Sequence, residues 1–361
     1  MTGYDAEKIL NDLEPAVAAI DVQHITPLPV DRWIASSCMQ KSIRRGNVKT
    51  AQRAALAYWM QDKRSFWNRL GIVCMEDCGV ASPDLIVQTL TISNAPAWRA
   101  KHNDWKVAAY LVRRMCETVK IRLCDEMYSI AGSAPEYQAY RQVMGKASNE
   151  TLADNVLHDG TSLPEKAISL WLLAGSKRYP ADNMPERNAS LYAAVDALRS
   201  LHAPHDLTEA CIASLRRSQY PLALFTPLLW TELQRHSLTE VQDQFQPSPV
   251  EQDIPLIALD GFTRIGKHSF AQLQKTIPGL KPFTTRQTAL SAFFSEGYCV
   301  NQRLTSTSLE AYRTAGEIID IEAAGLCVPS YMELRECLTS NLHVLEDIRR
   351  KRLRAYLKEA A

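Results

Sequence analysis

Gly261-Phe-Thr-Arg-Ile-Gly-Lys-His268 is the segment of this 361-residue chain whose spacing comes closest to a known reaction motif. A P-loop reads Gly-x-x-x-x-Gly-Lys-Ser/Thr, and its backbone N–H groups and lysine hold the phosphates of a nucleotide. Gly261, Gly266 and Lys267 fit this spacing, between an apolar run and a predicted helix. His268 replaces the hydroxyl residue that holds Mg²⁺, and only 93 residues follow it. One hypothesis is therefore a degenerate P-loop nucleotide-binding enzyme of nucleic-acid metabolism that uses Lys267.

The basic side chains of this segment suggest a second chemistry, contact with a phosphate backbone. Arg264, Lys267 and His268 fall at the start of the predicted helix, where they can meet nucleic-acid phosphates. The simpler interpretation is a solvated turn. Basic turns are common, and the whole chain carries a net charge of only +1, so any nucleic-acid contact must use a local patch.

Two further basic clusters are candidates for binding nucleic acid or a protein partner. They comprise Lys41, Arg44 and Arg45 near one end of the chain and Arg349, Arg350 and Arg352 near the other. Such cations can bind phosphates, or they can pair with carboxylates of a neighbouring subunit. The structural interpretation is the wet face of an amphipathic helix for the first cluster and compensation of the helix dipole for the second.

The other reactive residue types form no recognised catalytic or metal-binding motif. Nine cysteines are scattered among apolar neighbours, which predicts reduced, buried thiols. Cys74 and Cys78 lie four residues apart, but no His or Cys pair follows at the spacing of a zinc site. His202 and His205 lack a third ligand nearby, and no Gly-x-Ser-x-Gly or His-Glu-x-x-His motif occurs. We therefore predict no metal, no cofactor and no catalytic residue.

The composition predicts a mainly all-α protein. Only 14 glycines occur, and Ala, Leu, Arg and Glu are frequent, which favours helices over turn-rich β structure. No stretch approaches the roughly 20 apolar residues that span a bilayer, and the N-terminus lacks the form of a signal peptide. We expect a cytoplasmic protein with no membrane contact.

Apolar residues recur at helical spacing along almost the whole chain. The pattern predicts helices at 4–20, 32–45, 49–61, 65–78, 84–92, 104–130, 163–173, 190–201, 207–217, 269–276, 285–294, 308–324 and 331–357. Trp59, Phe66, Trp67, Trp98 and Trp105 fall on apolar faces and are expected in the core. The predicted domain organisation is an N-terminal helix and extended segment at 1–30, a helical domain at 31–245, a Pro-rich linker at 246–255 and a C-terminal helical region at 256–361.

Three motifs of the N-terminal half suggest a family. They are Lys41-Ser-Ile-Arg-Arg-Gly-Asn47, Ala54-Ala-Leu-Ala-Tyr-Trp-Met60 and Glu76-Asp-Cys-Gly-Val-Ala-Ser-Pro-Asp84. In order and approximate spacing they resemble the C-terminal helical collar of the RarA/MgsA/WRNIP1 family of clamp-loader-like AAA+ ATPases, over residues 33–130. The resemblance implies a module that assembles into rings near stalled replication forks, and it makes Glu76-Asp77 a turn-forming pair. Only about 30 residues precede the collar-like region, whereas a P-loop ATPase domain needs ~150, so the resemblance implies the collar without the motor.

Together these observations lead to three functional hypotheses. The first is a non-enzymatic oligomerising or adaptor protein that acts on DNA or on replication and repair machinery, as a homo-oligomer. The second is the degenerate P-loop enzyme. The third is a pure protein–protein scaffold whose basic clusters meet acidic partner surfaces.

Overall fold

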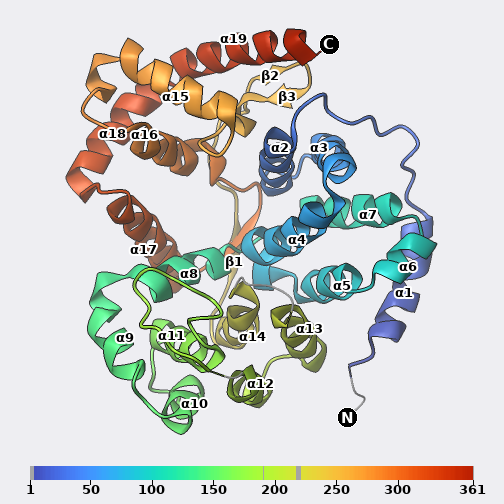
Figure 1. Ribbon diagram of the computed structural model, residues 1–361, viewed down its shortest axis with the longest axis vertical. Coiled ribbons are helices and arrows are strands. Elements are labelled where there is room, and N and C mark those ends of the chain that lie inside the picture. The colour runs from blue at the N-terminus through green and yellow to red at the C-terminus, as the bar shows by residue number, and fades with distance from the viewer. Residues whose placement is uncertain (1–3, 190, 217–220, 361) are drawn as a thin grey trace.

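Helices form almost the whole chain in the computed structural model, which describes residues 4–189, 191–216 and 221–360 (Figure 1). The all-α prediction is confirmed: nineteen α-helices and only four short strands are found over these ranges. The strands make two antiparallel ladders, β1 (Thr239–Val241) with β4 (Arg303–Thr305) and β2 (Val250–Glu251) with β3 (Ile254–Pro255). No helix in the described ranges is long and apolar enough to cross a membrane.

The N-terminal helices begin where short polar residues cap them. Asp31 accepts hydrogen bonds from the amides of Trp33 and Ile34, and Asn47 and Asp62 cap the next two helices in the same way. The helices of this part are α1 (Ala6–Ala18), α2 (Arg32–Arg44), α3 (Val48–Gln61), α4 (Lys63–Val73), α5 (Pro83–Ser93), α6 (Pro96–Lys101) and α7 (Asp104–Glu117). Between α4 and α5 the chain widens into one π-helical turn, Cys74–Cys78.

The predicted long helix at 104–130 is wrong, because it is broken at residues 118–122. The Lys120 amide donates to Gln302 and its carbonyl accepts from Leu304, while the Ile121 amide donates to Cys78. Because these backbone groups form hydrogen bonds with distant segments, they cannot form the hydrogen bonds that would continue the helix. The following helices are α8 (Leu123–Ser133), α9 (Gln138–Met144), α10 (Asn149–Leu157), α11 (Leu163–Ala174), α12 (Leu191–Ser200), α13 (His205–Leu215) and α14 (Leu222–Leu233).

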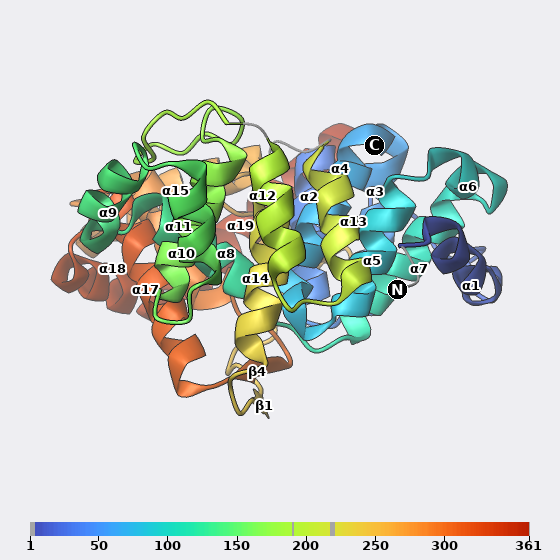
Figure 2. The ribbon, with the colours of Figure 1, turned by 90° about the horizontal axis from the view of Figure 1, so that it is seen from below.

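Helices α11 to α14 stand beside one another (Figure 2). A capping box of Ser162 and Glu165 starts α11, which is buried along nearly its whole length. The ends of two predicted helices, Ser190 and Arg217, lie outside the described residues.

The C-terminal part packs against the N-terminal half. It contains α15 (Arg264–Thr276), α16 (Thr285–Ala292), α17 (Thr307–Ala323), α18 (Val328–Ser340) and α19 (Leu342–Ala360). The helix predicted at 331–357 is two helices that meet at Asn341, whose side chain donates to the Cys337 carbonyl. Helix α17 lies along α8, and α15 lies beside α19 (Figure 1).

Residues on both sides of the predicted linker at 246–255 share one hydrophobic core. Ile254, Leu256 and Leu353 belong to the same buried cluster as the apolar residues of α2 to α14. A second cluster lies among α15, α16, α18 and α19. The predicted aromatic core holds for Phe66, Trp67 and Trp105, which are buried, while Trp59 and Trp98 are half-buried.

Candidate nucleic-acid interface

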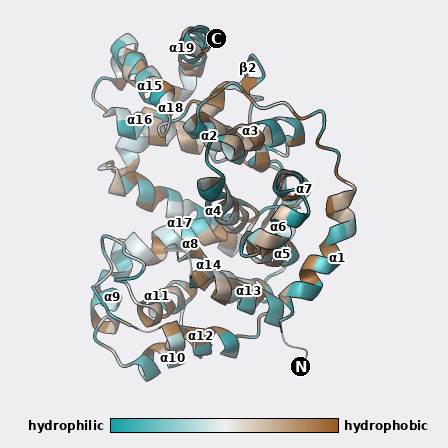
Figure 3. Cartoon of the chain, turned by 45° about the vertical axis from the view of Figure 1, so that its right-hand side comes forward, coloured by the Kyte–Doolittle hydropathy of each residue, from teal (hydrophilic) through white to brown (hydrophobic). Residues whose placement is uncertain are grey.

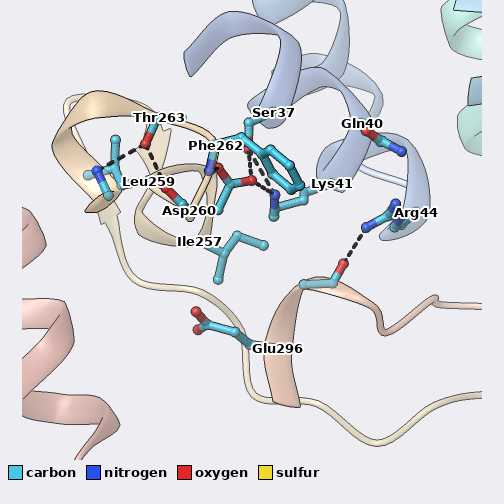
Figure 4. A network of polar contacts seen from close by, with 12 residues as sticks. Ser37, Gln40, Lys41, Arg44, Ile257, Leu259, Asp260, Phe262, Thr263 and Glu296 are labelled. Atoms are coloured by element: carbon cyan, nitrogen blue, oxygen red, sulfur yellow. Dashed lines mark hydrogen bonds and ion pairs between the residues drawn. The ribbon is translucent and has the colours of Figure 1, made fainter. Parts of the chain in front are cut away.

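Lys41 points into the protein. Its ammonium group donates to the Ser37 hydroxyl at 2.8 Å and pairs with the Asp260 carboxylate, which belongs to the turn before α15 (Figure 4). Burial by itself raises the pKa of a carboxyl, but Lys41, Ser37 and the Phe262 amide outweigh it and hold the pKa of Asp260 below its usual value. This pair therefore ties α2 to the C-terminal part.

Arg44 is also buried, in an ion cluster with Asp77. Its Nε lies 2.6 Å from Asp77 Oδ1, and a second nitrogen donates to the Gly297 carbonyl at 2.7 Å. Asp77 is fully buried and also accepts from Gln40 at 2.9 Å and from Arg122. Burial opposes its ionisation, yet the two guanidinium groups keep the pKa of Asp77 below its usual value.

Two consecutive acids of the π-helical turn reach one arginine. Glu76 and Asp77 both accept from Arg44, although neighbours in an α-helix point about 100° apart. Burial and the neighbouring carboxylates Asp125 and Asp77 raise the pKa of Glu76. The pair lies in the π-helical turn and is also the acidic centre of a buried ion cluster, a role that was not predicted.

In the C-terminal basic cluster, Arg349 and Arg350 both form ion pairs, and Arg349 is also buried. Arg349 is 1% exposed, donates to the Leu259 carbonyl at 3.0 Å and pairs with Glu296 at 2.7 Å. Arg350 pairs with Asp347 at 2.6 Å.

Arg45 is half-buried and donates to the Glu296 carbonyl at 2.7 Å. Lys41, Arg44 and Arg349, at most 6% exposed, were predicted to contact nucleic acid or a partner. Their burial removes them from any such surface, because an internal carboxylate already neutralises each of them.

Helix α15 presents the cations that remain available. Arg264, Lys267 and His268 are exposed, and Lys275 is exposed two turns further along. At 100° per residue these positions fall on one side of the helix, opposite its buried residues Ile265, Phe270 and Leu273. None of the four has an ion pair or a hydrogen bond from its side chain to another described residue.

Arg352 of α19 extends this side of α15. Two of its guanidinium nitrogens donate to Gln272 of α15, at 3.1 and 2.9 Å. Gln272 is neutral, and no carboxylate of the described residues pairs with Arg352. We call Arg264, Lys267, His268, Lys275 and Arg352 the basic face. From Arg264 to Lys275 it runs roughly 16 Å at 1.5 Å per residue.

The chain segment that carries α15 contains no acidic residue over a long stretch. Residues 261–295 contain five Lys or Arg residues and not one Asp or Glu. Helices α15 and α19, which carry the basic face, show many hydrophilic residues (Figure 3). The sequence alone already contained this acid-free run, and it is the signal that would have separated the exposed cations from the buried ones.

The turn before α15 has a geometry unlike a phosphate cradle. Thr263 caps the helix by accepting from the Gly266 amide at 3.0 Å, and the amides of Phe262 and Thr263 donate to Asp260. The preceding strand β3 has two residues and pairs antiparallel with β2, whereas a P-loop follows a strand and opens a helix with its amides free.

The two glycines of the P-loop-like spacing serve close packing. A Cβ on Gly266 would lie 1.8 Å from the Asp260 carbonyl oxygen, and one on Gly261 would lie 2.9 Å from the Ala289 side chain. Their spacing is thus accounted for by contacts within the protein.

We expect calorimetric titration with MgATP or MgGTP to give no binding heat, because the amides of Phe262, Thr263, Gly266 and Lys267 already donate to Asp260 and Thr263. The Lys267→Ala variant should behave in the same way. Saturable binding that Lys267→Ala abolishes would contradict this expectation and support the nucleotide-binding hypothesis.

Seven of the nine cysteines are buried, with Cys327 exposed and Cys337 half-buried. Within the described ranges, no three His, Cys, Asp or Glu side chains are placed to hold a metal ion.

Comparison of the chain with protein-family models, with curated proteins and with solved structures gave no match. The resemblance to the clamp-loader collar accordingly stays a prediction from the three motifs.

Proposed function

We propose that this protein is a non-enzymatic adaptor or oligomerising protein that binds nucleic acid, with DNA under replication or repair as its setting. The observation that carries the proposal is the basic face, four Lys and Arg side chains with His268 on one side of α15 and α19, none of which has a carboxylate partner among the described residues. Binding of a phosphate backbone by such groups releases counterions, which supplies most of the affinity of sequence-independent binding.

Only the resemblance of the three motifs to the clamp-loader collar supports the oligomerising part of the proposal. Lys41, Arg44 and the Glu76-Asp77 pair hold α2, the π-helical turn and the C-terminal part together. They are elements of architecture, so the surface for DNA has to lie elsewhere, and the basic face meets that requirement.

The test measures binding of three labelled DNAs, a 20-nucleotide strand, its duplex and a fork. Fluorescence anisotropy reports the binding at a series of salt concentrations. The variant Arg264→Glu/Lys267→Glu/Lys275→Glu should bind at least about tenfold more weakly, and the slope of log K against log salt should fall by about 3. These changes are expected because three phosphate contacts are lost.

A matched control reverses three exposed lysines far from α15 in the sequence. Lys8→Glu/Lys101→Glu/Lys146→Glu changes the net charge equally and should leave binding within about twofold, since the contact is local. Equal losses in both variants would show that only net charge matters. Absence of binding to all three DNAs at low salt, together with a monomer by light scattering, would overturn the proposed function.

A further inference from the structure

We infer that Phe262 is a base-stacking platform at the end of the basic face and that the ligand is single-stranded nucleic acid. The inference rests on the proposed function, since it specifies which nucleic acid that surface takes. It joins two observations, an aromatic ring held out into solvent and the free cations that follow it on α15.

Phe262 is the most exposed phenylalanine of the chain. Its exposed fraction is 81%, while Phe66, Phe225, Phe270 and Phe294 are at most 5% exposed and the other three are half-buried. An exposed phenylalanine gains nothing from the hydrophobic effect in the free protein. Its ring is therefore available for a ligand.

The turn that carries Phe262 is fixed by buried contacts on several sides. The Phe262 amide donates to Asp260 Oδ1 at 2.9 Å, and the other oxygen of that carboxylate is held by Lys41 and Ser37 (Figure 4). The Thr263 hydroxyl donates to the Asp260 carbonyl at 3.0 Å. The backbone that positions the ring is thus ordered before any ligand arrives, which lowers the entropic cost of binding.

The charges around this turn favour an anion. Arg264, Lys267 and His268 follow Phe262 within six residues and lie on one side of α15. The one acid of the turn, Asp260, is 9% exposed and is neutralised by Lys41. An exposed aromatic ring two residues before the first of these basic side chains matches a ligand that alternates π-faces with phosphates.

This combination separates single strands from duplexes. In a duplex the bases are stacked on one another, so Phe262 has no π-face to contact and only the cations can act. In a single strand each base offers a face, and stacking on an aromatic side chain contributes affinity with little dependence on sequence.

The experiment measures anisotropy of labelled dT20, U20 and a 20-base-pair duplex with the full chain and its variants. The wild type should bind both single strands more tightly than the duplex. Phe262→Ala should weaken single-strand binding about tenfold while duplex binding stays within about twofold. Phe262→Trp should restore single-strand binding, and the dT20 and U20 arms distinguish DNA from RNA.

Tyr192→Ala is the matched control, because Tyr192 is an aromatic residue of similar exposure, 80%, on α12. Helix α12 lies at the opposite end of the long axis from α15 (Figure 1). This variant should bind like the wild type, and circular dichroism melting should show that all variants remain folded.

The outcomes separate the inference from the proposed function. If the charge-reversed α15 variant loses binding but Phe262→Ala does not, or if Phe262→Ala weakens single strands and duplex equally, the stacking role is wrong and the proposed function stands. If polyglutamate binds as tightly as dT20 and also depends on Phe262, the partner is an acidic protein segment and the inference is overturned. No binding to any nucleic acid overturns both.

Discussion

Asp77→Ala is expected to lower the free energy of unfolding by about 3–5 kcal/mol, the range for breaking a buried ion pair by removing one partner. Asp77 is fully buried between Arg44 and Arg122, which are themselves at most 5% exposed. Without its carboxylate, the two buried guanidinium groups would keep only the partly exposed carboxylates of Glu76 and Asp125 as ion-pair partners among the described residues. Urea unfolding followed by circular dichroism measures the change.

The control uses an ion pair of equal length on the surface. Arg235 lies 2.6 Å from Asp159, the same distance as that between Arg44 Nε and Asp77, but the Asp159 side chain is 84% exposed. Asp159→Ala should leave the free energy of unfolding almost unchanged, because water solvates the arginine that is left behind. If Asp77→Ala and Asp159→Ala had similar costs, Asp77 would not be the centre of a buried ion cluster.

The ion cluster also shows why sequence reasoning found the helices more readily than the site. The capped starts at Asp31 and Asn47 are local signals, so α2 and α3 could be predicted closely. Whether Lys41 faces water or Asp260 depends on a residue 219 positions away, and no periodicity encodes that contact. Basic residues recur along a helix with the same spacing whether their side chains face water or a buried carboxylate.

The ends of some helices could not be predicted from the sequence either. The break after Glu117 follows from backbone pairing of Lys120 with the segment around Arg303, which is a long-range contact. Locally, residues 118–122 have no proline or glycine that would stop a helix. The exposed part of the site could have been predicted from the sequence. Arg264, Lys267 and His268 lie in a stretch without acidic residues, which the composition alone reveals.

Gly266→Ala is the prediction that separates packing from nucleotide chemistry at α15. The added Cβ would lie 1.8 Å from the Asp260 carbonyl oxygen, a backbone atom that cannot move without displacing the turn that holds Phe262. We expect a loss of about 3 kcal/mol in the free energy of unfolding, at the upper end for overpacked sites. Urea unfolding with and without MgATP measures it, and the loss should be the same in both.

Gly71→Ala is the matched control, a glycine inside α4 whose added Cβ would meet only Leu90 Cδ2 at an ordinary 3.7 Å. There the substitution should be neutral or stabilising by up to about 1 kcal/mol, because alanine is the better helix former. If Gly266→Ala is as mild as Gly71→Ala, close packing does not explain the glycine. If MgATP stabilises the wild type but not Gly266→Ala, the P-loop hypothesis regains its support. A loss confined to Gly266→Ala and independent of nucleotide instead makes this glycine part of the frame that holds Phe262 beside the basic face.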